Sequence, residues 1–307
     1  MDSLVALVGA NSSKSLESLI SQALDLVNFK LSSSPRSVVI KPNLAYYWDA
    51  STGYTTNPKV VSGLVDCLRE RYGEDLDIKI AEADASAMRT KYVFPALGYE
   101  KLAEEKGVEL LNLSNDDLID KIVHVNGRKM EFKVPQLLLK SDLFVNVPKL
   151  KIMRVTKITC AMKNIFGCIG FPRKFIYHPF LNEAIVGINK ILHPHLTVVD
   201  GLIALGRFPV RFDLIMAGVD PFSVDCIASE IMGYKASNVK FLQIAKKENL
   251  GNPSNIVTVG EDIEEFKRAF PKENFTSSKY WWNIQFWLIK IYRKIVGDVI
   301  PPFLEEA

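Results

Sequence analysis

Short apolar runs alternate with amphipathic stretches along most of this 307-residue chain. In its first half, each apolar run has the length of a strand, and the first three are each followed by a turn and by apolar residues at helical spacing. The predicted strands of this half are Leu4–Val8, Val38–Ile40, Ile78–Ala81 and Val108–Leu113. Successive strand–loop–helix units favour an α/β fold with a mainly parallel or mixed sheet and helices on both of its faces.

The middle of the chain departs from this pattern. Ile122–Val125 and Lys129–Val134 flank Asn126-Gly127, a dipeptide that is typical of a tight hairpin turn. We therefore expect a hairpin insertion that decorates one edge of the sheet. Further strands are predicted at Leu143–Val147, Leu196–Val199, Leu214–Val219 and Ile256–Val259. Residues 1–260 are thus predicted to form the α/β domain, as one body or as two lobes.

The C-terminal part, residues 261–307, differs in composition and is predicted to be a helical extension. Trp281, Trp282 and Trp287 lie close together, and basic residues follow them at intervals. This spacing predicts an amphipathic aromatic helix over Trp281–Val296. Such a helix packs on its own domain or on a second copy of the chain, or it lies on a membrane surface.

The composition limits the class of protein. Hydrophobic residues make up 48% of the chain, which excludes a disordered protein. The four cysteines are scattered, without the spacing of a zinc or iron–sulfur site. The N-terminal apolar run is too short for a signal peptide, and no run reaches the length of a membrane span. These features predict a cytoplasmic protein, either in solution or peripheral to a membrane.

The stretch between Asp142 and Glu183 contains no acidic residue. Its basic residues are Lys149, Lys151, Arg154, Lys157, Lys163, Arg173 and Lys174. Apolar residues recur near helical spacing among them, which indicates a partly buried segment that lines an anion-attracting pocket. The alternative is a solvated positive patch, since the chain carries 38 basic and 35 acidic residues and a net charge of only +3.

Two residues of this stretch are predicted to be catalytic. Lys163 would hold an anionic group or, if its apolar neighbours lower its pKa, act as a nucleophile. His178 would transfer a proton or bind a metal ion. The alternatives are a lysine whose stem covers the core and a loop histidine that makes one hydrogen bond.

Other polar residues are expected at the carboxyl ends of the strands, where open α/β sheets bind their ligands. Asp225 interrupts an otherwise apolar helix, which favours a paired or liganded carboxylate. The predicted ligand-binding residues are Lys41, Asn43, Lys149, Lys151, Asn164, Asp200 and Asp225.

Several sequence blocks occur together in one order. They are VVIKPNL (38–44), GYTTNPKVV (53–61), LKSDLFVNVPKLK (139–151), ITCAMKNIFGCIG (158–170) and AGVDPFSVDCIASEIMG (217–233). In these blocks the chain resembles the domain-of-unknown-function 362 family, whose members are often described as uncharacterised iron–sulfur centre proteins. Many members append a ferredoxin-like segment with clustered cysteines. This chain has the aromatic segment in its place, so we expect no iron–sulfur cluster.

A looser resemblance concerns chemistry. Lys163, Gly167, Gly170 and His178 are similar in order and spacing to a segment of the lactate racemase superfamily. In that superfamily the lysine and the histidine hold a nickel-pincer cofactor. The resemblance therefore implies a cofactor-holding role for Lys163 and His178.

These observations predict an enzyme-like protein that binds an anionic small molecule or cofactor, with or without a metal ion, at the carboxyl edge of the sheet. They identify neither the cofactor nor the reaction. The alternative is a non-enzymatic module that binds nucleic acid or a membrane surface. Nucleic acid is the less favoured partner, because the basic residues are not interleaved with exposed aromatic residues.

Overall fold

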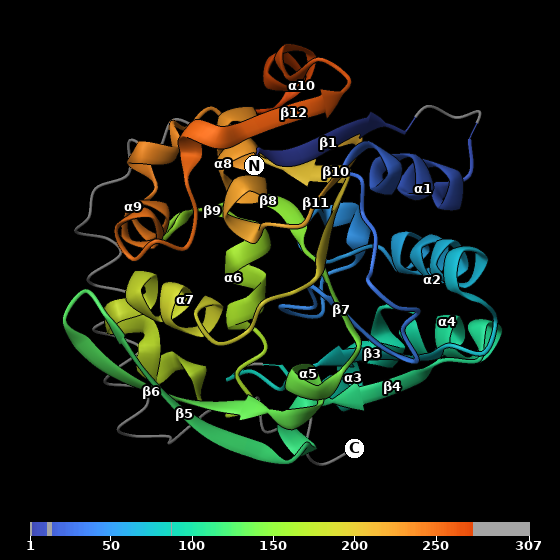
Figure 1. The fold of residues 1–307 in the computed structure, drawn as a ribbon, viewed down its shortest axis with the longest axis horizontal. Helices are drawn as coiled ribbons and strands as arrows, with labels where there is room; N and C mark the ends of the chain where they lie inside the picture. Colours follow the sequence, from blue (N-terminus) through green and yellow to red (C-terminus); the bar gives the residue numbers. More distant parts are fainter. Residues whose placement is uncertain (1, 11–13, 87, 273–307) are drawn as a thin grey trace.

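A mixed sheet forms the centre of the molecule in the computed structural model, which describes residues 2–10, 14–86 and 88–272 (Figure 1). Over these residues the sheet has ten strands, and its main path follows the order β12-β1-β11-β10-β7-β2-β3-β4. The strands are β1 (Ser3–Gly9), β2 (Ser37–Pro42), β3 (Asp77–Glu82), β4 (Glu109–Asn112), β7 (Leu143–Val147), β8 (Lys149–Met153), β9 (Lys157–Thr159), β10 (Leu196–Leu205), β11 (Pro209–Gly218) and β12 (Ile256–Gly260).

The five strands from β10 to β4 along this path are all parallel to their neighbours. On the other side, β11 runs antiparallel to both β10 and β1, and β12 is parallel to β1. The prediction of a mainly parallel or mixed sheet is confirmed. β8 continues beyond β7 and pairs with β10, with β9 antiparallel beside it.

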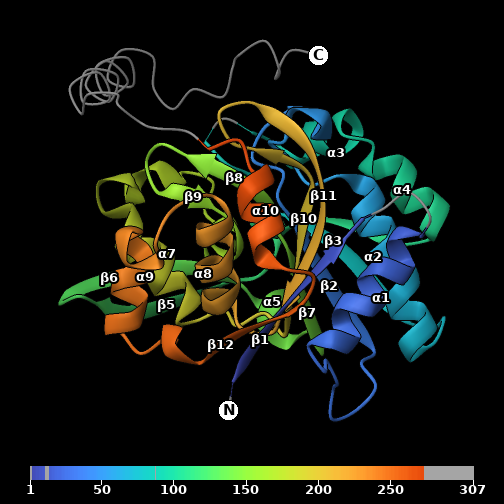
Figure 2. The same cartoon turned by 90° about the horizontal axis from the view of Figure 1, so that it is seen from above.

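Helices cover both faces of the sheet, as predicted (Figure 2). One face carries α1 (Leu16–Leu26), α2 (Pro58–Tyr72), α3 (Thr90–Ala96) and α4 (Tyr99–Lys106). The other carries α6 (Ala161–Phe166), α7 (Leu181–Asn189), α8 (Pro221–Ile231) and α9 (Lys240–Lys247). Two short helices complete the set, α5 (Gln136–Lys140) and α10 (Ile263–Ala269).

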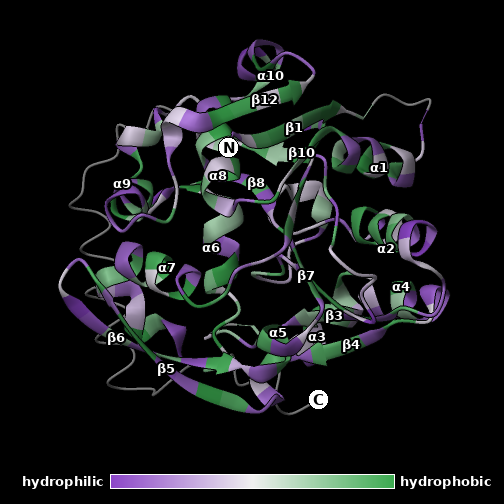
Figure 3. Ribbon diagram, viewed as in Figure 1, coloured by the Kyte–Doolittle hydropathy of each residue, from purple (hydrophilic) through white to green (hydrophobic). Residues whose placement is uncertain are grey.

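Alternation along the strands divides the core between these two helical layers. In β2, Val38 and Ile40 belong to the cluster packed on α1 and α2, whereas Val39 belongs to the cluster on the opposite face. All three side chains are fully buried, and each contributes roughly 1.5–3 kcal/mol of hydrophobic stabilisation. The central strands are accordingly hydrophobic, while peripheral helices such as α2 carry both polar and apolar residues (Figure 3).

The predicted hairpin is present as β5 (Leu118–Val125) and β6 (Arg128–Pro135). Asn126 and Gly127 form its turn, and both have the positive φ that a tight hairpin turn requires. The two strands pair with each other in a separate sheet and, within the described residues, with no edge strand of the main sheet. Phe132 on its apolar face instead packs closely against Gly187 of α7, where a Cβ would lie 2.9 Å from the ring.

The first residues of the predicted C-terminal extension pack on the main fold. The rings of Phe266 and Phe270 lie 5.7 and 5.6 Å from the ring of Phe212 on β11, measured between centroids. The predicted helix over Trp281–Val296 lies outside the described residues. Among the helices that are described, none combines the length and the apolar character needed to cross a membrane.

The strand order reverses between β2 and β7. These strands are parallel neighbours in which Lys41 is aligned with Asn146, and Pro42 with Val147. The chain leaves β2 toward β3 and β4 on one side, whereas β7 leads to β8 and β10 on the other. Such a reversal of strand order is where open α/β sheets place their ligand sites, at the carboxyl ends of the strands.

Candidate functional site

Five lysines gather at the carboxyl ends of the central strands, and we refer to them as the lysine network. They are Lys41, Lys149, Lys151, Lys163 and Lys174. Four of them are at most 6% exposed, and Lys163 is half-buried. Buried ammonium groups are costly unless they are paired, so the partners of each lysine determine what the network can do.

Two lysines of the network form buried ion pairs. Lys41, at the end of β2, lies 2.7 Å from the carboxylate of Glu82 at the end of β3. Lys149 lies 2.8 Å from Asp200 on β10, and both of these side chains are fully buried. Asp200 also accepts hydrogen bonds from the backbone N–H groups of Asn57 and Leu202, so both of its oxygens have partners.

Three asparagines connect β2, β7 and α6 beside these ion pairs. The amide of Asn43 donates to the Asn164 side-chain oxygen at 2.8 Å, and the amide of Asn164 donates to Asn146 at 2.8 Å. All three side chains are buried, and Asn146 donates in turn to the carbonyl of Ala161. The chain of amides fixes the start of α6 against the ends of the two strands.

Lys151 is buried without an acidic partner among the described residues. Its Nζ donates to Oδ1 of Asn43 at 2.7 Å and to the carbonyl of Tyr54 at 2.6 Å. Burial lowers the pKa of Lys151 well below its ordinary value, and the charges of Lys163, Lys149 and Lys41 lower it further. These electrostatic effects show that the lysines lie within reach of one another.

Lys163 and Lys174 also donate only to uncharged oxygens in the part of the chain that the structure describes. Lys163, on α6, donates to the Thr159 hydroxyl at 3.0 Å. Lys174, at the start of a 3₁₀ helix (Lys174–Phe180), donates to the carbonyls of Asp84 and Gly167, each at 2.8 Å. Burial lowers the pKa of both amines to about 8. Both groups therefore titrate close to neutral pH.

His178 lies in the same 3₁₀ helix, half-buried, with its ring 4.7 Å from that of Phe175. Burial lowers the pKa of His178 to about 4, and the charge of Lys163 contributes to this shift. The two predicted catalytic residues thus lie within electrostatic reach of each other. At neutral pH the imidazole is therefore uncharged, and an uncharged imidazole carries one nitrogen of the acceptor type.

Asp225 holds α6 in place. It is fully buried on α8, and its two oxygens accept hydrogen bonds from the backbone N–H groups of Ala161 at 2.6 Å and Met162 at 3.0 Å. Burial raises the pKa of Asp225 to about 7. Because α6 carries Lys163 and Asn164, Asp225 positions these two side chains.

The structure brings most of the predicted residues together. Lys41, Asn43, Lys149, Lys151, Asn164 and Asp200 form one connected region, with Lys163 and His178 beside it. Sequence reasoning did not select Glu82, Asn146 or Lys174. The signal for Glu82 was present, since it ends a predicted strand at the same edge as Lys41. The role of Lys174 depends on a turn that sequence spacing does not reveal.

No group of three or more His, Cys, Asp or Glu side chains with metal-binding geometry occurs among the described residues. The four cysteines are free and buried, and burial raises the pKa of each thiol.

Comparison with known proteins places this region inside a segment that a family model matches. The family model "Domain of unknown function (DUF362)" matches residues 38–230, which include the whole site. The Thylakoid-associated protein sll1697 of Synechocystis sp. is 24% identical over 231 residues, which cover 71% of this chain and 69% of that protein.

A similar solved structure is the lactate racemase apoprotein from Thermoanaerobacterium thermosaccharolyticum. The TM-score is 0.37 and the sequence identity is 14%. The match covers 70% of this chain and 54% of the racemase chain, so this protein spans about half the length of that structure.

Proposed function

The chain belongs to the domain-of-unknown-function 362 family, and we propose that it is an enzyme-like protein that binds a small anionic molecule or cofactor at the lysine network. One observation carries this proposal. Lys151, Lys163 and Lys174 donate only to uncharged oxygens within the described residues, whereas Lys41 and Lys149 each face a carboxylate. A bound anion would supply the missing negative charge.

The chemistry of the site favours a compact anion such as a phosphate or a carboxylate. A compact anion can accept hydrogen bonds from several ammonium groups at once, and these bonds are stronger in a buried site than in water. Binding would raise the pKa of Lys163 and Lys174 from about 8, because a nearby negative charge favours the protonated amines. By linkage, affinity should be highest below pH 8 and should weaken above it, where these amines lose their protons.

Within this site, Lys163 and His178 are the residues proposed to take part in chemistry. Lys163 has a pKa of about 8, so a fraction of it is an uncharged amine at neutral pH and can act as a nucleophile or a base. His178 is uncharged there and can accept a proton or bind a metal ion. If a metal or an organic cofactor binds, these two side chains would hold it, as the resemblance to the lactate racemase superfamily implies.

The test is ligand-induced stabilisation across a panel of phosphate, pyrophosphate and small carboxylates, each compared with chloride at equal ionic strength. We expect at least one of these anions to raise the unfolding midpoint of the wild type. Lys151→Met and Lys163→Met should lose this effect, and His178→Gln should reduce it. Lys101→Met is the matched control, since the Lys101 side chain is 79% exposed on α4.

The test also needs a control for folding. Circular dichroism of each unliganded variant shows whether it folds, and Lys163→Met is the safer variant because its side chain is only half-buried. Wild-type shifts in both folded lysine variants would refute the proposed site. Replacing an unpaired buried lysine also removes its desolvation cost, so Lys163→Met should lose anion binding without losing stability.

Membrane-surface association is a second candidate function. The curated relative is named for its association with thylakoids, and the segment Trp281–Val296 has the aromatic and basic pattern of an interfacial helix. Liposome flotation of the full chain and of a chain that ends at Glu273 would test this idea. Loss of flotation on truncation supports it, and equal flotation of both chains rules it out.

A further inference from the structure

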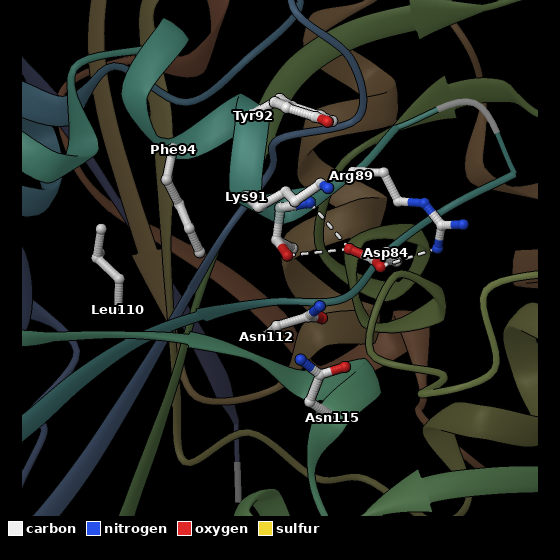
Figure 4. A pocket seen from close by; sticks show the side chains of 9 residues that line it. Asp84, Arg89, Lys91, Tyr92, Phe94, Leu110, Asn112 and Asn115 are labelled. Atoms are coloured by element: carbon white, nitrogen blue, oxygen red, sulfur yellow. Dashed lines mark hydrogen bonds and ion pairs between the residues drawn. The ribbon is translucent and has the colours of Figure 1, made fainter. Parts of the chain in front are cut away.

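A cavity lies beyond the carboxyl ends of β3 and β4, on the side of the sheet covered by α3 (Figure 4). Its volume is about 440 Å³, which is within the range of small-molecule sites, roughly 300–1,000 Å³. The residues that line it are Asp84, Arg89, Thr90, Lys91, Tyr92, Phe94, Leu110, Asn112 and Asn115. No lysine of the lysine network is among them.

Two cations of this cavity are available to a ligand. Arg89 donates from one Nη to Asp84 at 3.0 Å, and in the described part of the chain its guanidinium has no other partner. Four N–H groups therefore remain, including the Nε edge that binds carboxylates and phosphates in a bidentate manner. Lys91 is exposed, and its amine lies 4.6 Å above the ring of Tyr92 without a carboxylate partner among these residues.

Asp84, the one carboxylate among the described residues that line the cavity, is already hydrogen-bonded. Asp84 accepts hydrogen bonds from the backbone N–H and the hydroxyl of Thr90, both at 2.9 Å, in addition to the bond from Arg89. These bonds lower the pKa of Asp84 although burial opposes them, so the group stays ionised and bound to its own loop. Because Arg89 and Lys91 carry two positive charges and Asp84 carries one negative charge, the lining has a net positive charge.

Two asparagine side chains add neutral donors. Asn112 uses its Oδ1 to accept from the backbone N–H of Ser114, which leaves its Nδ2 group free within the described structure. Asn115 is exposed and lines the same cavity. Figure 4 shows both amides close to Asp84, with Phe94 and Leu110 on the apolar side of the cavity. Cationic and amide donors thus face an apolar wall.

We propose that this cavity is a second ligand site, which binds a small organic anion. The carboxylate or phosphate group of this anion would contact Arg89 and Lys91. The asparagine amides would donate hydrogen bonds to its polar substituents, and its apolar portion would pack on Phe94 and Leu110. No residue of the lysine network lines this cavity, and the two regions adjoin where Lys174 donates to the backbone carbonyl of Asp84.

Calorimetric titration with phenyl phosphate, and with inorganic phosphate as the probe without an apolar part, tests this proposal. Asn115→Asp places a negative charge in the cavity at an exposed position, so the full chain should fold and should bind phenyl phosphate at least about tenfold more weakly. Lys91→Gln should weaken binding as well. Lys101→Gln is the control for loss of an exposed lysine on a neighbouring helix and should bind like the wild type.

Lys151→Met separates this site from the lysine network. It should retain phenyl phosphate binding at the cavity, whatever it does to binding at the network. Wild-type affinity in both Asn115→Asp and Lys91→Gln overturns the second site, and so does the absence of phenyl phosphate binding to the wild type at millimolar concentration. Binding that is lost only in Lys151→Met overturns it too, and would leave the proposed function intact.

Discussion

Lys149 and Lys151 lie two residues apart on β8, and both side chains are at most 1% exposed, but their partners differ in charge. Lys149 contacts the carboxylate of Asp200, which is also held by two backbone N–H groups. Lys151 contacts an amide oxygen and a carbonyl. The comparison shows that the fold compensates one cation completely and leaves the next with neutral partners.

The same division extends across the lysine network. Lys41 and Lys149 link neighbouring strands through their ion pairs, so these two charges belong to the architecture. Lys151, Lys163 and Lys174 each have a lowered pKa because burial disfavours their charged forms. The charge of Glu82 opposes this shift at Lys151 and Lys174, but no described carboxylate forms an ion pair with any of the three. A buried cation without a counter-charge lowers stability, and a bound anion would supply the opposite charge.

Removing the carboxylate partner of a paired lysine should have the largest effect on stability. Asp200→Asn leaves Lys149 buried without a counter-charge, and we expect the free energy of unfolding to fall by roughly 3–5 kcal/mol. Urea denaturation measures this change. The control is Asp120→Asn, which breaks an exposed pair with Lys133 and should change stability by less than about 1 kcal/mol. A similar loss of unfolding free energy in both variants would contradict the claim that the buried pair contributes more to stability than the exposed pair.

The pH dependence of Asp225 should give the next largest effect. Its pKa of about 7 in the folded protein lies above the value of about 4 in the unfolded chain, so the native state binds more protons between these values. Stability contributed by this group should therefore fall as pH rises from about 4 to 7, by at most about 1.4 kcal/mol per pH unit. The difference in unfolding free energy between wild type and Asp225→Asn, measured across this range, should show the fall. A difference that does not change with pH would contradict it.

Lys163, which has no carboxylate partner among the described residues, should produce a smaller pH dependence of stability, with the opposite sign. Lys163 has a pKa of about 8 when folded and about 10.4 when unfolded, so the unfolded state binds more protons between these values. Stability should rise with pH across this window, and Lys163→Met should lack its share, roughly 1–2 kcal/mol after allowance for solvent screening of a half-buried group. Denaturation from pH 8 to 10.5 measures it, and Lys101→Met should match the wild type. Parallel curves for wild type and Lys163→Met would contradict the assignment.

The sequence predicted the fold class well because hydrophobic periodicity reports burial directly. Apolar runs such as Val38–Ile40 and Leu143–Val147 lie within β2 and β7, and Asn126-Gly127 forms the expected turn. The packing partner of the hairpin was not predicted, because periodicity shows which face of Phe132 is buried but not which element covers it. That element is α7, whose Gly187 lies 55 residues after Phe132 in the chain.

The residues of the site were easier to predict than their partners. The absence of acidic residues between Asp142 and Glu183 indicated a basic site in this stretch. Lys41 and Asn43 were predicted because they follow a strand at its carboxyl end, where open α/β sheets bind ligands. Pairing depends on strand order, which the sequence does not state. Only the alignment of β8 with β10 shows that Lys149 meets Asp200 while Lys151 does not.

The protonation of the lysine side chains tests the central claim most directly. Nuclear magnetic resonance of ¹⁵N-labelled lysine amines, with Lys163 assigned from Lys163→Met, gives the pKa of this group in chloride and in saturating inorganic phosphate. We predict a pKa of about 8 in chloride and a rise of more than about one unit in phosphate, as the anion stabilises the charged amine. The same pKa in both solutions would contradict the claim that the unpaired lysines receive an anion.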